Sequence, residues 1–112
     1  MGIEENRVQR EVCEYLNREG WFAFRINNSA IYDQTRGAYR KPQPFQINGI
    51  ADVCAIKDGR TIWIECKTKS GVQSDAQVLF EKAITNRGGE YLLIRSVEDL
   101  HEFFHVNRRA AS

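Results

Sequence analysis

The sequence predicts a single α/β domain in which helices flank a mixed β-sheet, and three observations support this fold class. The chain of 112 residues is 42% hydrophobic, enough for one modest core. Apolar residues recur at helical spacing in three stretches, whereas β-branched and aromatic residues gather in short runs between them. The alternation of these stretches along the chain is typical of an α/β sandwich.

The first half of the chain predicts a helix, a strand and a long loop. Apolar residues within 8–16 have the spacing of one helix face, so we expect a helix near residues 4–19, ended by Gly20. Residues 21–26 are aromatic and branched, as strands are. Residues 27–48 show no clear period. So long a loop is unusual in a compact domain and suggests a segment that contacts substrate or forms a dimer.

The second half begins with a predicted β-hairpin. Two apolar runs, residues 50–56 and 61–66, flank an Asp-Gly dipeptide at 58–59, which favours a two-residue hairpin turn. With such a turn the numbers of paired residues sum to 117, so Asp52 lies opposite Glu65. The two carboxylates then share one face of the sheet.

The remaining chain predicts a helix, a strand and a closing helix. Ser74 and Gln77 have the spacing of a capping box, so a helix should begin at Ser74 and end before Gly88. Residues 91–94 predict a fourth strand, and Ser96 can cap a short final helix. The predicted order of elements is α-β-β-β-α-β-α.

Composition limits the domain count and the cellular location. We expect one domain, residues 1–106, followed by a flexible tail, 107–112. No run of 18 consecutive apolar residues occurs, so neither a signal peptide nor a membrane partner is expected. The three cysteines are odd in number and lack CxxC spacing, which favours reduced thiols in a cytoplasmic protein.

Charge is nearly balanced overall but unevenly distributed. Sixteen basic residues almost cancel fifteen acidic ones, giving a net charge of +1. Residues 25–45 hold four basic residues against Asp33 alone, a local charge of +3 that leaves −2 elsewhere. A patch that binds a nucleic-acid backbone and a merely solvated loop both fit this distribution. The candidate DNA-binding residues are Arg36, Arg40, Lys41 and Lys69.

The carboxylates of Asp52 and Glu65 point to metal chemistry. Both interrupt apolar runs, and opposed Cβ atoms lie about 5 Å apart, so the two charges repel unless a cation lies between them. Lys67 shares the face of Glu65 because side chains alternate along a strand. Carboxylates, a main-chain carbonyl and waters suit Mg²⁺ or Mn²⁺, and the lysine can orient water or stabilise phosphate charge. The set predicts phosphodiester hydrolysis.

Each of these residues also has a purely structural interpretation. Asp52 can cap a strand end, and Glu65 can form an ordinary salt bridge with Lys67 or Lys69. The capping box explains Gln77 without catalysis. Polar residues of the first helix either reach the site or simply form its wet face: Glu5, Gln9 and Glu11.

The segments GIADV, IECK and SDAQ resemble the PD-(D/E)XK nuclease superfamily and, within it, the stand-alone VRR-NUC domain nucleases of phages and bacteria. The likeness covers most of the chain, from a Glu-containing first helix to the closing GGEYLLIRSVEDL. Ala51 stands where the superfamily usually has proline before the aspartate. The resemblance implies a restriction-endonuclease-like fold, a mixed β-sheet flanked by helices.

The resemblance also implies roles for individual residues. Asp52 and Glu65 would bind Mg²⁺ or Mn²⁺ together with the Cys66 carbonyl. Glu4 and Glu11 are alternatives to Glu5 as the first-helix acid. Further implications are DNA as substrate, including branched DNA such as Holliday junctions, a homodimer, and a bacterial or phage-infected cell. The implied catalytic residues are Asp52, Glu65, Lys67, Gln77 and Glu5.

Two other functions are compatible with the sequence. Residues 101–105, HEFFH, match the HExxH motif of zinc metalloproteases, although the seven residues that follow supply no customary third ligand. Two surface histidines, His101 and His105, flanking core phenylalanines are the better explanation of the motif. A catalytically silent DNA-binding module, or a subunit that needs a partner, is the second alternative, since no duplex-reading helix is evident.

Overall fold

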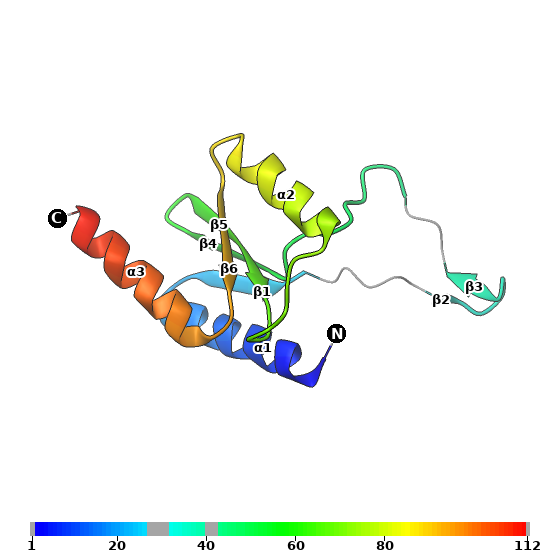
Figure 1. Cartoon of the computed structure of the whole chain (residues 1–112), viewed down its shortest axis with the longest axis horizontal. Coiled ribbons are helices and arrows are strands. Elements are labelled where there is room, and N and C mark those ends of the chain that lie inside the picture. The colour runs from blue at the N-terminus through cyan, green and yellow to red at the C-terminus, as the bar shows by residue number, and fades with distance from the viewer. Residues whose placement is uncertain (1, 27–31, 40–42, 112) are drawn as a thin grey trace.

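The computed structural model describes residues 2–26, 32–39 and 43–111 (Figure 1). The predicted helices and strands are all present, in the predicted order. The final helix continues past Asn107, into the segment expected to form a tail. The elements of the main body are α1 (Ile3–Arg18), β1 (Phe22–Arg25), β4 (Val53–Lys57), β5 (Arg60–Cys66), α2 (Asp75–Thr85), β6 (Glu90–Ile94) and α3 (Val97–Ala111).

The architecture is a four-stranded sheet between two layers of helix. The strand order is β1-β4-β5-β6. Strands β4 and β5 are antiparallel whereas β5 and β6 are parallel, so the sheet is mixed, as predicted. Helices α1 and α3 lie side by side on one face, and α2 lies on the other (Figure 1). No helix within the described residues has the length and apolar content needed to cross a lipid bilayer.

The β4–β5 hairpin has the predicted register. Lys57 pairs with Arg60 next to the turn, and Val53 pairs with Ile64 at the other end, so paired numbers sum to 117. The turn residues at 58–59 have φ angles of 51° and 78°, as a two-residue type I′ turn requires. The next pair in this register would be Asp52 and Glu65.

The long loop contains structure that the sequence did not predict. A short hairpin, β2 (Tyr32–Asp33) and β3 (Ala38–Tyr39), forms a separate two-stranded sheet. Within the described residues this hairpin contacts no other helix or strand, and it lies apart from the main body (Figure 1). The expectation of a loop without structure was therefore wrong here. The strands are too short for a period, and the turn depends on the left-handed backbone of Gly37, φ 66°.

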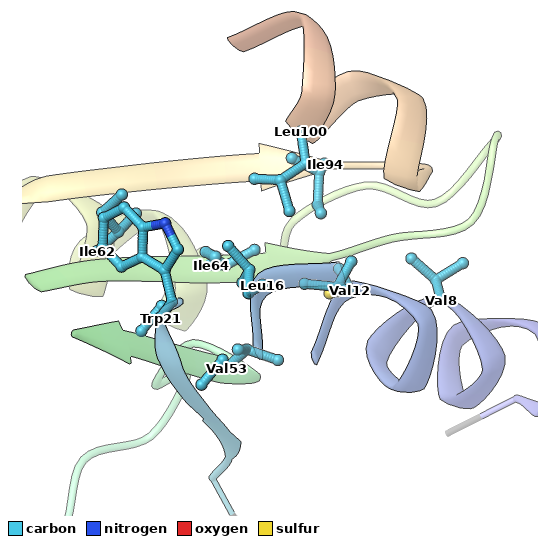
Figure 2. Packing of buried hydrophobic residues seen from close by; sticks show 12 residues of the cluster. Val8, Val12, Leu16, Trp21, Val53, Ile62, Ile64, Ile94 and Leu100 are labelled. Atoms are coloured by element: carbon cyan, nitrogen blue, oxygen red, sulfur yellow. The ribbon is translucent and has the colours of Figure 1, made fainter. Parts of the chain in front are cut away.

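The main core lies between the sheet and the helices α1 and α3 (Figure 2). Alternate strand residues such as Val53, Ile62 and Ile64 point into it and meet Leu16 and Leu100. Because side chains alternate across a sheet, Glu65 and the start of β4 at Asp52 face the other side, toward α2. Among the cysteines, Cys54 and Cys66 are buried free thiols, as expected.

Candidate active site

The candidate site lies at the end of the β4–β5 hairpin that is remote from its turn. Asp52 precedes β4, Glu65 is near the end of β5, and Lys67 follows β5 directly. Glu5, in the first turn of α1, and Gln77, in the first turn of α2, contact this group from the two helical layers. The structure therefore brings together the residues that the resemblance implied.

Asp52 is fixed by main-chain hydrogen bonds. Its Oδ2 accepts the N–H of Cys66 at 2.9 Å, and its carbonyl accepts the N–H of Ile26 at 2.8 Å. The N–H of Lys67 bonds to Ile94 on the opposite side of β5, at 2.9 Å. Successive N–H groups of a strand point to opposite sides, which explains why the N–H of Cys66 faces Asp52. The Asp52 side chain thus extends the hairpin ladder beyond Val53.

Glu65 is a buried carboxylate with one oxygen bonded and one not. Its side chain is 1% exposed. Gln77 Nε2 donates to Oε2 at 2.9 Å, and the Lys67 ammonium lies 3.7 Å from the same oxygen. Oε1 is buried and has no hydrogen-bond partner among the described residues. Burial, and then the Asp52 carboxylate, raise the pKa of Glu65 to about 8.

Lys67 lies between two carboxylates. Its Nζ is 3.8 Å from Glu5 Oε1 and 3.7 Å from Glu65 Oε2. Both distances exceed hydrogen-bonding range, so neither contact is a formed hydrogen bond. Of the other first-helix acids, Glu4 is exposed and Glu11 faces Arg7 at 4.0 Å. Glu5 is therefore the first-helix acid that the structure places at the site.

Gln77 makes both contacts that the sequence left as alternatives. Its main-chain N–H donates to Ser74 Oγ and its Oε1 accepts the N–H of Ser74, which completes the capping box of α2. Its Nε2 donates to Glu65. The Gln77 side chain thus caps α2 and contacts the candidate site at the same time.

The oxygen donors at this place fit a hard divalent cation. Asp52 and Glu65 supply carboxylates, and Glu65 Oε1 is a buried acceptor without a partner. The N–H and C=O of one strand residue point the same way, so the Cys66 carbonyl belongs to the Asp52 side of β5. The described chain holds no cluster of three His, Cys, Asp or Glu side chains suited to a metal. The remaining ligands would be main-chain and water oxygens, which such ions accept.

The basic residues proposed for DNA binding are dispersed. Lys69 is exposed, two residues beyond Lys67. Arg36 is exposed in the β2–β3 turn, which stands apart from the sheet in Figure 1. Arg40 and Lys41 lie outside the described residues. Of the two that the structure describes, Lys69 is the one that follows the candidate catalytic residues closely along the chain.

The HEFFH segment has a structural explanation in α3. The rings of His101 and His105 stack with centroids 5.4 Å apart, and His101 Nδ1 lies 3.2 Å from the Tyr15 hydroxyl. Phe103 and Phe104 pack against the core. A third metal ligand for the histidines is absent from the described residues. These contacts match surface histidines that flank core phenylalanines.

Sequence reasoning missed Arg95, which organises the loop after Lys67. Its Nη1 donates to the carbonyls of Thr68 at 2.6 Å and Gly71 at 2.7 Å, with the Lys69 carbonyl at 3.3 Å. Its position in the sequence, directly after a predicted strand, was the signal that could have identified it. Parallel neighbouring strands place the residue after β6 beside the residue after β5, and Arg95 follows a strand that the pattern had identified.

The chain has a restriction-endonuclease-like fold. This fold class is defined by the mixed sheet, the helices that cover it and the position of the candidate site at the end of the hairpin. Comparison with solved structures narrows this class. A structure described as a VRR_NUC domain is similar with a TM-score of 0.67, at 15% sequence identity, and the match covers 93% of this chain and 97% of that chain. The fold is therefore that of a VRR_NUC domain, as the resemblance implied. The sequence matches no protein-family model and no curated protein.

Proposed function

We propose that this protein is a nuclease that hydrolyses DNA phosphodiester bonds with the aid of Mg²⁺ or Mn²⁺. The observation that carries the proposal is the state of Glu65, a buried carboxylate with an unpartnered oxygen beside Asp52 and Lys67. The Lys67 ammonium lies 3.7 Å from Oε2, too far for a hydrogen bond, and no described group reaches Oε1. A buried acceptor without a partner is costly, so a functional ligand is the better explanation.

Asp52, Glu65 and the Cys66 carbonyl would hold the metal ion. When bound, such an ion supplies Lewis-acid stabilisation of phosphate charge and a lower pKa for the attacking water. In the reaction, water adds to phosphorus, the ester P–O bond breaks, and the leaving oxygen takes a proton. Asp52 has little freedom to move, because its side chain and main chain are both hydrogen-bonded.

Lys67 would stabilise the negative charge that develops on the phosphate. The Lys67 side chain is 12% exposed, so it is largely shielded from bulk water but still accessible, and its ammonium lies 3.8 Å from Glu5 and 3.7 Å from Glu65. A preorganised cation in such a place favours the transition state over the ground state. Glu5 would act through Lys67 by keeping the ammonium at the mouth of the site.

For the substrate we propose DNA, with branched forms such as Holliday junctions as the preferred class. Lys69, beside the site, and Arg36, on the separate β2–β3 hairpin, are exposed cations that suit contacts with phosphates. Because these contacts reach the backbone rather than base edges, they would position DNA without reading its sequence. A hairpin that stands apart from the sheet suits a substrate that extends beyond the site (Figure 1).

A homodimer is part of the same proposal. The edge strand β1 carries Phe22 and Phe24, whose rings contact each other at 5.1 Å and whose side chains are 66% and 37% exposed. Apolar rings on an edge strand suit burial against another protein surface. Size-exclusion chromatography with light scattering tests this point, and a monomer at micromolar concentration would contradict it.

The test of the nuclease proposal is cleavage of labelled four-way junction, flap, single-stranded and duplex DNA with Mg²⁺ or Mn²⁺. Lys57→Met is the matched control, because Lys57 lies on the same hairpin but donates to the Glu19 carbonyl at 2.8 Å. Asp52→Asn and Lys67→Met should each lower the rate about 100-fold or more. Lys57→Met should stay within about twofold of the wild type. A folded wild type that cuts none of these substrates would support the silent or partner-dependent module instead.

A further inference from the structure

The first turn of α2 meets the candidate site through a single amide group. Ser74 is the N-cap of α2, and its main-chain N–H donates to Gln77 Oε1 at 2.8 Å. The amide nitrogen of the same side chain donates to Glu65 Oε2 at 2.9 Å. The oxygen of Gln77 therefore serves the helix cap while its nitrogen serves the carboxylate.

Only one orientation of this amide satisfies both partners. A glutamine amide has an acceptor at the oxygen and donors at the nitrogen. In the flipped orientation the NH₂ group would face the N–H of Ser74, and this contact between two donors is repulsive whatever the protonation state of Glu65. The Ser74 N–H belongs to the main chain and cannot rotate away. It therefore decides which end of Gln77 faces Glu65.

A close backbone contact holds this turn of α2 in place. Gly49 has φ +77°, and a Cβ atom added there would lie 2.4 Å from the carbonyl carbon of Ala76 and 2.6 Å from the nitrogen of Gln77. Such distances are far below any tolerated contact, so only glycine fits. Gly49 lies three residues before Asp52 in the chain. The segment that leads to one carboxylate thus abuts the turn that binds the other.

The consequence for Glu65 is that its two oxygens become distinct. Oε2 receives the Gln77 donor and is the oxygen nearer to Lys67, whereas Oε1 has no partner among the described residues. We propose that Ser74 is a positioning residue, whose main-chain N–H orients the Gln77 amide so that Glu65 is held by Oε2 and presents Oε1. The expected effect of Ser74 on activity rests on the proposed nuclease function. Its expected effect on the orientation of the Gln77 amide does not.

Two substitutions at Ser74 separate its main-chain N–H from its hydroxyl. Ser74→Ala removes the hydroxyl cap and keeps the N–H. Ser74→Pro removes both, and the native φ of −73° lies within the range of proline, so the backbone needs no change there. The difference between the two variants therefore isolates the N–H.

The readouts are cleavage kinetics and the side-chain NH₂ signals of Gln77 in ¹H–¹⁵N spectra of the metal-free protein, assigned by their loss in Gln77→Glu. Ser74→Ala should keep the NH₂ shifts and slow hydrogen exchange of the wild type. Ser74→Pro should move the shifts toward those of a solvated amide. Its kcat should fall about tenfold or more below that of Ser74→Ala, with KM for DNA within about twofold.

Gln77→Glu tests the donor directly. A glutamate at this position still accepts the N–H of Ser74, since Ser-x-x-Glu is also a capping box, but it offers no donor to Glu65. Helix content by circular dichroism should be kept while kcat falls at least about tenfold. Equal amide spectra and equal kcat in Ser74→Ala and Ser74→Pro, or wild-type kcat in Gln77→Glu, would overturn the inference. If the wild type cuts no DNA, the nuclease proposal fails, and the amide spectra alone decide the role of Ser74.

Discussion

The two ends of the β4–β5 hairpin both concentrate charge, but they use it differently. At the turn end, Arg60 donates to both oxygens of Glu90, at 2.6 and 2.7 Å, on the surface. At the other end, the Lys67 ammonium stays 3.7 Å from the buried Glu65, and one Glu65 oxygen has no partner in the described chain. Protein groups saturate the pair at the turn end but not the pair at Glu65, which is the difference expected if Glu65 and Lys67 serve the proposed function.

The two glutamates of this comparison are shifted in opposite directions. The hydrogen bond from Arg60 lowers the pKa of Glu90, since it stabilises the charged form. Burial raises the pKa of Glu65 to about 8, since it penalises the charged form. Because each pKa shift has a cause in the surrounding structure, the contribution of each glutamate to stability should depend on pH.

The largest expected effect separates the two glutamates by activity. Glu65→Gln should reduce DNA cleavage about 100-fold or more, because it removes a carboxylate that we propose binds the metal. Glu90→Gln is the matched control and should leave cleavage within about twofold. The measurement is single-turnover cleavage of the best substrate. Equal losses of cleavage activity in the two variants would contradict a special role for Glu65.

A second expected effect concerns the stability of the metal-free protein. Glu65 has a folded pKa of about 8 against an ordinary 4.5, so its contribution is fully present below pH 4.5 and is lost as the pH rises through 8. The melting temperature measured in EDTA should therefore fall relative to that of Glu65→Gln between pH 5 and 8.5, by about 10–20 °C. Parallel curves for the two proteins would contradict the raised pKa.

A third expected effect is stabilisation by metal. A ligand that binds only the folded state adds about 2.7 kcal/mol at a concentration 100 times its Kd. Mg²⁺ or Mn²⁺ should raise the melting temperature of the wild type and of Glu90→Gln, but not of Asp52→Asn. An equal rise in Asp52→Asn would place the bound ion elsewhere on the molecule.

The smallest expected effect is at the turn end. Arg60 and Glu90 are partly exposed, so solvent screens their attraction and Arg60→Ala should cost at most about 1 kcal/mol in the free energy of unfolding. Urea denaturation measures this cost. The loss should shrink at high salt, and a larger, salt-independent loss would show that the pair is structurally as important as the core.

Much of the fold could be predicted because its signals are local. The Asp-Gly turn at 58–59 and the alternation of the flanking strands set the register, and from it the proximity of Asp52 and Glu65. The capping box at Ser74 set the start of α2. The β2–β3 hairpin gave no such signal, because its strands of two residues are too short to show alternation.

The details of the site depended on packing between distant segments. The sequence offered Glu4, Glu5 and Glu11 alike, and only the packing of α1 against the sheet places Glu5 beside Lys67. Arg95 was missed because its partners are main-chain carbonyls, which carry no residue-type signal. Gln77 looked ambiguous because the sequence cannot show that one amide has two partners at once.

The type I′ turn at 58–59 sets the register on which the proposed chemistry depends, although it lies far from the site. The five residues of β4, Val53–Lys57, separate it from Asp52, a distance of about 20 Å along the strand. One residue inserted in the turn would slip β5 by one position and rotate Glu65 into the core beneath α1, with an isoleucine or a cysteine taking its place. A genetic screen for inactive variants should therefore recover lesions at this surface turn alongside those at the carboxylates themselves.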